Sequence, residues 1–182
     1  MNLLTSKLRH VLAVTITAGI VLSSSSAIAA EQVVLKYKIL REKISVQELT
    51  RLTQTGIPSP ALASYLKLAG KKPEDIRQPL IQVVKVNPLI LDRTLNSWVG
   101  NAVLDQMSQA IHTPSNQANR QALRSAIILS ATPDGKLTLL EVMQNYPTQE
   151  VEVEGDRLVA TYRQLSGLSG RLENLLNRGR FF

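Results

Sequence analysis

The amino-acid sequence predicts a mainly α-helical fold: a single multi-helix domain with a small two-stranded sheet formed by segments near residues 33–39 and 149–154. Three observations lead to this fold class. Helix-capping residues and helix-ending glycines and prolines recur through the middle of the chain. Short segments on either side of this region alternate apolar with charged side chains. About 150 residues follow the N-terminal leader described below, which is enough for one hydrophobic core.

The two strand candidates have complementary charges. In residues 33–39, four apolar side chains alternate with Lys36 and Lys38, and in residues 149–154 two valines alternate with three glutamates. Side chains at every second position of a strand lie on the same face. We therefore expect the two segments to pair, with their apolar faces inward and their lysines opposite the glutamates.

Two capping boxes mark helix starts. Ser45 stands three residues before Glu48, and Thr138 stands three residues before Glu141. In this motif the hydroxyl and the carboxylate each accept a hydrogen bond from the other residue's backbone amide. We expect the first helix to end at Gly56, and the second to stop before Pro147.

Prolines mark further helices. Ser59-Pro60, Pro73 and Asn87-Pro88 are typical helix starts, because the missing amide hydrogen costs nothing in the first turn. Pro79 lies inside the expected third helix and should kink or end it. A later helix is expected over residues 116–131.

An apolar stripe follows Trp98. We interpret Trp98 and Met107 as core packing, because no polar residues converge beside them as a cofactor site would require. Four apolar residues from Trp98 onward follow one another at steps of four, which predicts that they lie on one core-facing side of a helix: Val99, Val103, Met107 and Ile111.

The N-terminus predicts a secretory signal peptide over residues 1–29. Basic residues precede an uncharged run over residues 11–22, which is shorter than the roughly 20 residues of a membrane anchor. Ala27 and Ala29 are the small residues that signal peptidase recognises, so we expect cleavage after Ala29, with Ala30 as the alternative. An uncleaved amphipathic or anchoring helix is disfavoured by length and flanks. The helical domain then spans residues 30–176 and a C-terminal tail residues 177–182.

This signal predicts export to the periplasm or another extracytoplasmic compartment. The chain carries 21 Lys+Arg and 14 Asp+Glu, so removing Lys7 and Arg9 leaves 19 − 14 = +5. An exported chain with 4% aromatic residues is a poor candidate for binding nucleic acid. A solvated basic surface explains the charge most simply, and an anionic membrane surface or an acidic partner is the alternative.

The chemistry-bearing residues are too few to predict catalysis. After the leader there is one histidine, His112, and there is no cysteine and no G-x-S-x-G motif in the chain. We expect His112 at a helix C-terminus, where it meets the helix dipole. No spacing of acids and histidines matches a metal site, and no phosphate-binding loop is present. We predict no catalytic residue, no metal and no cofactor.

Two arginines form a weak candidate binding site. Arg120 and Arg124 lie four residues apart near the start of a predicted helix, where cations oppose the dipole unless an anion faces them. We favour the acidic segment 150–156 as an internal partner, or a solvated face, over an external anionic ligand. The C-terminal Phe181-Phe182 pair is either a free peptide end or a tail tucked onto the core.

Several motifs together resemble a known family. The segments after the leader are Val34-Leu35-Lys36-Tyr37, Ile44-Ser45-Val46, Leu91-Asp92-Arg93, Arg120-Gln121-Ala122-Leu123-Arg124, Leu139-Leu140-Glu141-Val142 with Asn145-Tyr146-Pro147, and Val153-Glu154-Gly155-Asp156-Arg157-Leu158. They resemble the exported cyanobacterial domain family described as "alpha/beta hydrolase of unknown function". In longer members, the resemblance implies, this helical region precedes a separate hydrolase domain. Because that half is missing here, no catalytic role carries over to any residue.

The sequence therefore predicts a non-catalytic interaction or accessory module. One alternative is a detached lid or regulatory part of an exported, esterase-like α/β hydrolase, and another is a carrier of an apolar ligand. A large closed cavity would favour the carrier, whereas a solid core with an exposed apolar patch would favour the interaction module. The partner could be another exported protein such as a hydrolase, and the oligomeric state stays open.

Overall fold

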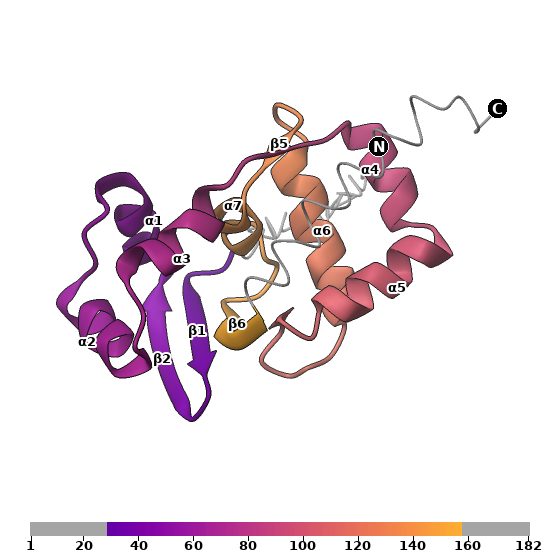
Figure 1. Ribbon diagram of the computed structural model, residues 1–182. Coiled ribbons are helices and arrows are strands. Elements are labelled where there is room, and N and C mark those ends of the chain that lie inside the picture. The colour runs from indigo at the N-terminus through magenta and orange to yellow at the C-terminus, as the bar shows by residue number, and fades with distance from the viewer. Residues whose placement is uncertain (1–28, 158–182) are drawn as a thin grey trace, which may run out of the picture.

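The computed structural model describes residues 29–157 (Figure 1). Within this range it contains seven α-helices and a short 3₁₀-helix, Gly155–Arg157. The α-helices are α1 (Val46–Thr55), α2 (Pro60–Ala69), α3 (Pro73–Ile81), α4 (Pro88–Leu95), α5 (Trp98–Met107), α6 (Asn119–Ala131) and α7 (Leu139–Gln144). The strands are β1 (Gln32–Tyr37), β2 (Leu40–Ser45), β3 (Val84–Lys85), β4 (Ile111–His112), β5 (Lys136–Leu137) and β6 (Glu150–Glu154).

The predicted pairing of the two ends of the domain is confirmed. β1 and β6 lie side by side and run parallel, with Val33 opposite Val151 and Leu35 opposite Val153. The first strand is shorter than predicted, because Lys38 adopts a left-handed conformation (φ 54°) and Ile39 is 97% exposed. These two residues form the turn of a hairpin.

The prediction of a mainly α fold with a two-stranded sheet is only partly correct. The sheet has four strands in the order β2-β1-β6-β4, and β3 and β5 form a second, two-stranded sheet. The domain is therefore mixed α/β. Sequence reasoning missed β2 because its exposed face carries charges, and missed β4 because two residues give no visible alternation.

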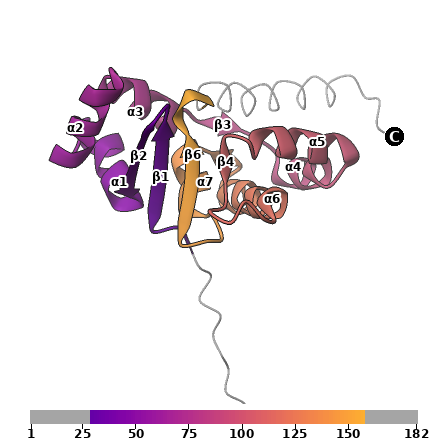
Figure 2. The ribbon, with the colours of Figure 1, turned by 90° about the horizontal axis from the view of Figure 1, so that it is seen from below.

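Helices lie beyond both edge strands of the four-stranded sheet. Figure 2 shows its strands side by side, with α1, α2 and α3 beside β2 and with α4, α5 and α6 beyond β4. None of the described helices combines the length and the hydrophobicity that crossing a membrane requires.

Both capping boxes are confirmed. The Ser45 hydroxyl accepts a hydrogen bond from the Glu48 amide at 3.0 Å, and the Glu48 carboxylate accepts one from the Ser45 amide at 3.1 Å. Thr138 and Glu141 make the same two bonds at the start of α7. Gly56 ends α1 in the left-handed conformation (φ 73°), as its position after the helix predicts.

Two helix boundaries differ from the prediction. α3 continues through Pro79 and ends at Ile81, two residues later. α6 begins at Asn119 instead of residue 116, because Asn116 and Ala118 have positive φ angles that no α-helix accommodates.

The prediction of the buried face of α5 is partly wrong. Trp98 is 82% exposed, so its interpretation as core packing is wrong, whereas Met107 is fully buried as expected. The buried face of α5 consists of Gly100, Leu104 and Met107. Steps of four residues drift around a helix that repeats every 3.6, so positions 100, 104 and 107 share the inner face.

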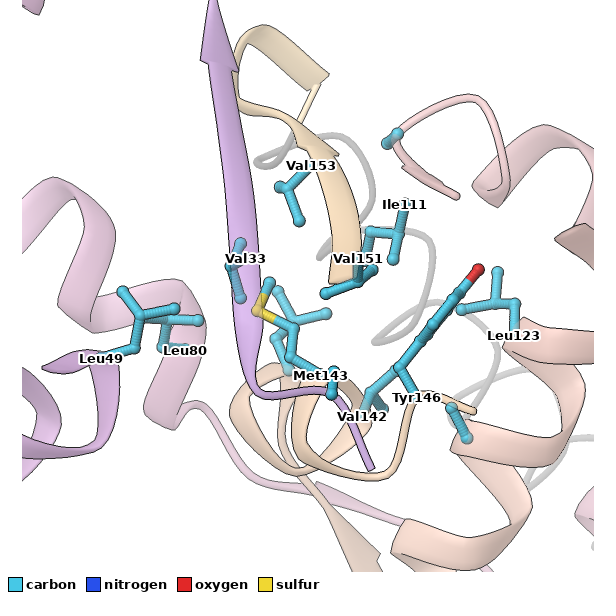
Figure 3. Close-up of a cluster of buried hydrophobic side chains, with 14 of the residues drawn as sticks. Val33, Leu49, Leu80, Ile111, Leu123, Val142, Met143, Tyr146, Val151 and Val153 are labelled. Carbon is cyan, nitrogen blue, oxygen red and sulfur yellow. The ribbon is translucent and has the colours of Figure 1, made fainter. Parts of the chain in front are cut away.

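The hydrophobic core is one cluster to which the four-stranded sheet and all seven described α-helices contribute, and Figure 3 shows part of it. Val33 and Val151 meet Val142 and Met143 there, and the ring of Tyr146 extends toward Leu123. The Tyr146 side chain is fully buried, and within residues 29–157 its hydroxyl has no hydrogen-bond partner. Burial raises the pKa of this phenol.

Several predictions fall outside the described residues. These are the leader apart from Ala29, the part of the predicted domain after residue 157, and the tail over residues 177–182.

Candidate functional site

The outer face of the four-stranded sheet carries a cluster of ion pairs. Glu152 contacts Lys36 and lies 2.7 Å from Nη2 of Arg41, and Lys36 also reaches Glu154 at 3.3 Å. At the edge of the cluster, Lys43 pairs with Glu150 at 2.5 Å. The predicted pairing with the glutamates is thus confirmed for Lys36 but not for Lys38, which lies in the turn after β1; the other cations, Arg41 and Lys43, come from β2.

Glu152 is buried, which is unusual for a carboxylate. Only 5% of the residue is exposed, and it lies on the central strand β6 between β1 and β4. Burying a charge is costly unless it is paired. Two cations meet this requirement, and Arg41 is the partner that sequence reasoning missed, because it lies on the unrecognised strand β2.

His112 completes this cluster instead of ending a helix. It lies on β4 opposite Glu152, so its prediction at a helix C-terminus is wrong. Its Nε2 lies 3.3 Å from Oε1 of Glu154, and its Nδ1 lies 3.0 Å from the carbonyl oxygen of Thr113. A neutral imidazole donates from one nitrogen only, so only the doubly protonated ring donates to both oxygens. Both ring nitrogens of His112 therefore lie within hydrogen-bond distance of oxygen atoms of the protein.

A polar pocket of about 360 Å³ opens beside His112. Asp105, Ser108, Asn116 and Asn119 contribute to its lining. The Ser108 hydroxyl is buried and has no hydrogen-bond partner among the described residues, so it makes no bond to the imidazole. A serine nucleophile needs a base within hydrogen-bond reach. The pocket therefore lacks an assembled serine–histidine pair.

The two arginines of the candidate binding site meet partners on α4 and α5. Arg120 forms a two-pronged ion pair with Asp105, at 2.7 and 2.5 Å. This hydrogen bonding lowers the pKa of Asp105. Arg124 donates to the carbonyl oxygen of Leu95 at 3.1 Å and to Oδ1 of Asn101 at 2.5 Å. The acidic partner is thus Asp105, and the expectation that segment 150–156 faces these arginines is wrong.

These contacts give Arg120 and Arg124 an internal role, connecting α6 to the α4–α5 hairpin. Their binding of an external anion stays a prediction. Asp105 could not be nominated from sequence, because it lies 15 residues from Arg120 and has no motif around it.

Stability should fall at alkaline pH. Hydrogen bonding to Glu152 raises the pKa of Lys36 above its ordinary 10.5, and burial raises the pKa of Tyr65 from 10 to about 12. A raised folded-state pKa gives stability that is complete below the unfolded-state value and is lost as pH rises through the folded-state value. The free energy of unfolding should therefore decline above about pH 10.

Urea unfolding at several pH values from 8 to 12 checks this expectation. The Tyr65→Phe variant should show a shallower decline between pH 10 and 12, because it has no phenol to ionise. Equal slopes for the two proteins would contradict the role given to Tyr65.

The structure is that of a small mixed α/β domain with a cluster of ion pairs on the outer face of its four-stranded sheet. Residues 29–154, which are 126 of the 182 residues, match the family model described as "Alpha/beta hydrolase of unknown function (DUF1400)". The chain belongs to this family. Neither the curated proteins nor the solved structures contain a match to it.

The family description names a hydrolase, and two features of known hydrolase sites can be compared with this chain. Within residues 29–157, no group of three or more metal-ligating side chains could hold a metal ion. The chain has no G-x-S-x-G motif, which places the serine on the strand-to-helix turn of an α/β hydrolase.

Proposed function

We propose that this protein is a non-catalytic accessory module that binds another exported protein, with a hydrolase as the partner. The observation that carries the proposal is the exposure of Trp98. This side chain is 82% exposed at the start of α5, beside Val99, which is 46% exposed. Tryptophan is enriched among the residues that dominate binding energy at protein interfaces.

The surface around Trp98 is held on a rigid support. The Ser97 hydroxyl caps α5 by accepting a hydrogen bond from the Gly100 amide at 3.1 Å. Arg124 bonds to Leu95 before Trp98 and to Asn101 after it, so both sides of the residue are tied to α6. A side chain presented by ordered backbone loses little conformational entropy on binding, which favours affinity.

The interior favours an interaction module over a carrier. Two pockets among the described residues have volumes of about 250 and 360 Å³, and both are open to solvent. The first has lining residues from β1, α2 and α3, and the second is the polar pocket beside His112. An apolar carrier needs an enclosed apolar space for its ligand.

The leader sequence supports export, and export limits the partner to other exported proteins. The short apolar run and the small residues Ala27 and Ala29 are typical of secretory signals. The family description supports a hydrolase as the partner, because such a protein would supply the catalytic groups that we do not find among the described residues.

Affinity capture with matched variants tests the proposal. The protein would be used as bait in an exported fraction from its source organism, beside Trp98→Ser and the control Leu68→Ser, which alters a 74% exposed leucine on α2. We expect the wild-type and Leu68→Ser proteins to retain a protein with a hydrolase domain, and Trp98→Ser to retain at least tenfold less. Equal retention by all three, or no hydrolase at all, would overturn the proposal.

An activity measurement separates this proposal from an enzyme. The purified chain should not hydrolyse p-nitrophenyl esters, whereas ester hydrolysis that His112→Ala abolishes would show that the chain is itself a hydrolase. A captured hydrolase whose rate changes on adding the module would assign a regulatory role to the same contact.

A further inference from the structure

The polar pocket beside His112 lies at the C-terminal end of α5, at the opposite end of this helix from Trp98. Its volume is about 360 Å³, within the roughly 300–1,000 Å³ of sites for small ligands. Every described residue that lines it is polar: Asp105, Ser108, Gln109, His112, Asn116, Asn119 and Arg157. A lipid, or a peptide with apolar side chains, would find no apolar surface there. The lining therefore favours a small polar ligand.

Two residues of the lining carry opposite charges, and both have partners. The Asp105 carboxylate accepts two hydrogen bonds from the guanidinium group of Arg120, at 2.7 and 2.5 Å. Arg157 donates to the side-chain oxygen of Gln109 at 3.0 Å and to its carbonyl oxygen at 3.4 Å. A carboxylate and a guanidinium group in the same lining favour neither an anion nor a cation.

His112 is the remaining ionisable residue of the lining, and it faces acids that have other partners. Its ring nitrogens lie 3.3 Å from Oε1 of Glu154 and 3.8 Å from Oε2 of Glu152. Both glutamates also contact Lys36. Groups of both signs therefore surround the pocket, and an uncharged ligand can enter without leaving a charge unpaired.

Three side chains of the lining have unused hydrogen-bonding capacity. Ser108 is 7% exposed, and its hydroxyl has no partner among the described residues. Within residues 29–157, the side-chain nitrogens of Asn116 and Gln109 donate no hydrogen bond, although the side-chain oxygen of each accepts one. A buried hydroxyl without a partner costs free energy, which a ligand that supplies the partner would recover.

Asn116 is held in place by its own loop. The Thr113 amide donates to Oδ1 of Asn119 at 3.0 Å, and Nδ2 of Asn119 donates to Oδ1 of Asn116 at 2.6 Å. These bonds fix the Asn116 carboxamide through its oxygen and leave its nitrogen for another acceptor. A group that is ordered before binding loses little conformational entropy when the ligand arrives.

We propose that this pocket binds a monosaccharide. A sugar is uncharged, and each of its hydroxyls both donates and accepts hydrogen bonds. It can therefore accept from Asn116 and Gln109, exchange a bond with Ser108, and donate to the Asp105 carboxylate. The proposal does not rest on the Trp98 surface, and its failure would leave the proposed function untouched.

A titration with matched ligands tests the site. Backbone amide spectra of the protein would be followed with D-glucose, D-galactose and D-mannose, with cyclohexanol as a ring that has one hydroxyl, and with glucose 6-phosphate as a charged sugar. We expect saturable binding of at least one of the three sugars with a Kd below about 30 mM, and shifts centred on Ser108 and Asn116. Glucose 6-phosphate should bind no tighter than glucose, and cyclohexanol more weakly than the sugar.

A failure of all three sugars to saturate would overturn the proposal. Cyclohexanol binding as tightly as the best sugar, glucose 6-phosphate binding more tightly than glucose, or shifts centred on Trp98 would overturn it as well.

Variants assign the contacts. Asn116→Asp keeps the oxygen that bonds to Asn119 and tolerates the positive φ of 55°, but removes the amide donor. It should weaken sugar binding about fivefold, and Ser108→Ala should do the same while keeping the wild-type melting temperature. Asn87→Asp is the control, because it adds the same charge at the cap of α4, where aspartate caps as well as asparagine. Unchanged sugar binding by Asn116→Asp, or an equal loss in Asn87→Asp, would contradict the site.

Discussion

Replacing Gly100 with alanine should destabilise the protein by roughly 3 kcal/mol or more, although alanine is the better helix former. Gly100 lies in the first turn of α5, where the helix approaches the end of α4. An added Cβ would lie 2.0 Å from the carbonyl oxygen of Thr94 and 2.6 Å from Leu95 Cα. Both contacts are with backbone atoms, so no side-chain rotation relieves them.

The expected loss of stability is opposite in sign to the usual effect of replacing a helical glycine with alanine. In an exposed helix interior, changing glycine to alanine stabilises by up to about 1 kcal/mol, because it reduces the entropy of the unfolded chain. At Gly100 the clash with α4 outweighs this gain. Accommodating alanine requires α5 to move away from α4, and the surface around Trp98 moves with it.

Urea unfolding followed by far-UV circular dichroism, which reports the loss of helix, measures the effect. Ala102→Gly is the control, because it changes an exposed residue of the same helix and should cost about 1 kcal/mol or less. A Gly100→Ala protein as stable as the wild type would show that α4 and α5 are not closely packed. Its capture of a partner would also report whether the proposed surface tolerates the shift.

Replacing Glu152 with glutamine should lower the free energy of unfolding by about 2 kcal/mol. The substitution keeps the shape of the side chain but removes the negative charge that faces Lys36 and Arg41. Breaking a buried ion pair typically costs about 3–5 kcal/mol, because one charge stays buried without a partner. The expected loss is smaller here, since the Lys36 and Arg41 side chains are 25% and 57% exposed and regain water.

Glu150→Gln is the matched control on the same strand and face. Its partner Lys43 is 56% exposed, so the change should cost less than about 1 kcal/mol. A double-mutant cycle of Glu152→Gln with Lys36→Met then measures the coupling of the central pair. Equal losses for the two glutamates, or a cycle without coupling, would contradict a central role for Glu152.

The helix starts could be predicted because their signals are local. Ser45 and Glu48 are three residues apart, and the two bonds between them form within one turn. The same holds for Thr138 and Glu141. The prediction of the start of α6 was wrong because Ala118 adopts a left-handed conformation, which is uncommon for alanine and has no sequence signal.

The candidate site was predicted less well than the helices. The pairing of lysines with glutamates followed from charge alternation on two strands. The position of His112 did not, because β4 is two residues long and is a strand only through its pairing with β6. The prediction that Trp98 packs in the core was wrong, because its exposure depends on what the neighbouring helices cover.

The sequence by itself determined where most helices begin and end, which two distant segments pair, and that the chain has no familiar nucleophile motif. These features depend on a few adjacent residues or on simple alternation. Only the tertiary structure decided that Glu152 is buried between cations, that Trp98 is exposed, and that Tyr37 and Tyr65 help to form a pocket. Such features depend on contacts between distant residues, as Lys36 and Glu152 show at a separation of 116 positions. Packing decides which of these contacts form, because burial is a property of the assembled domain.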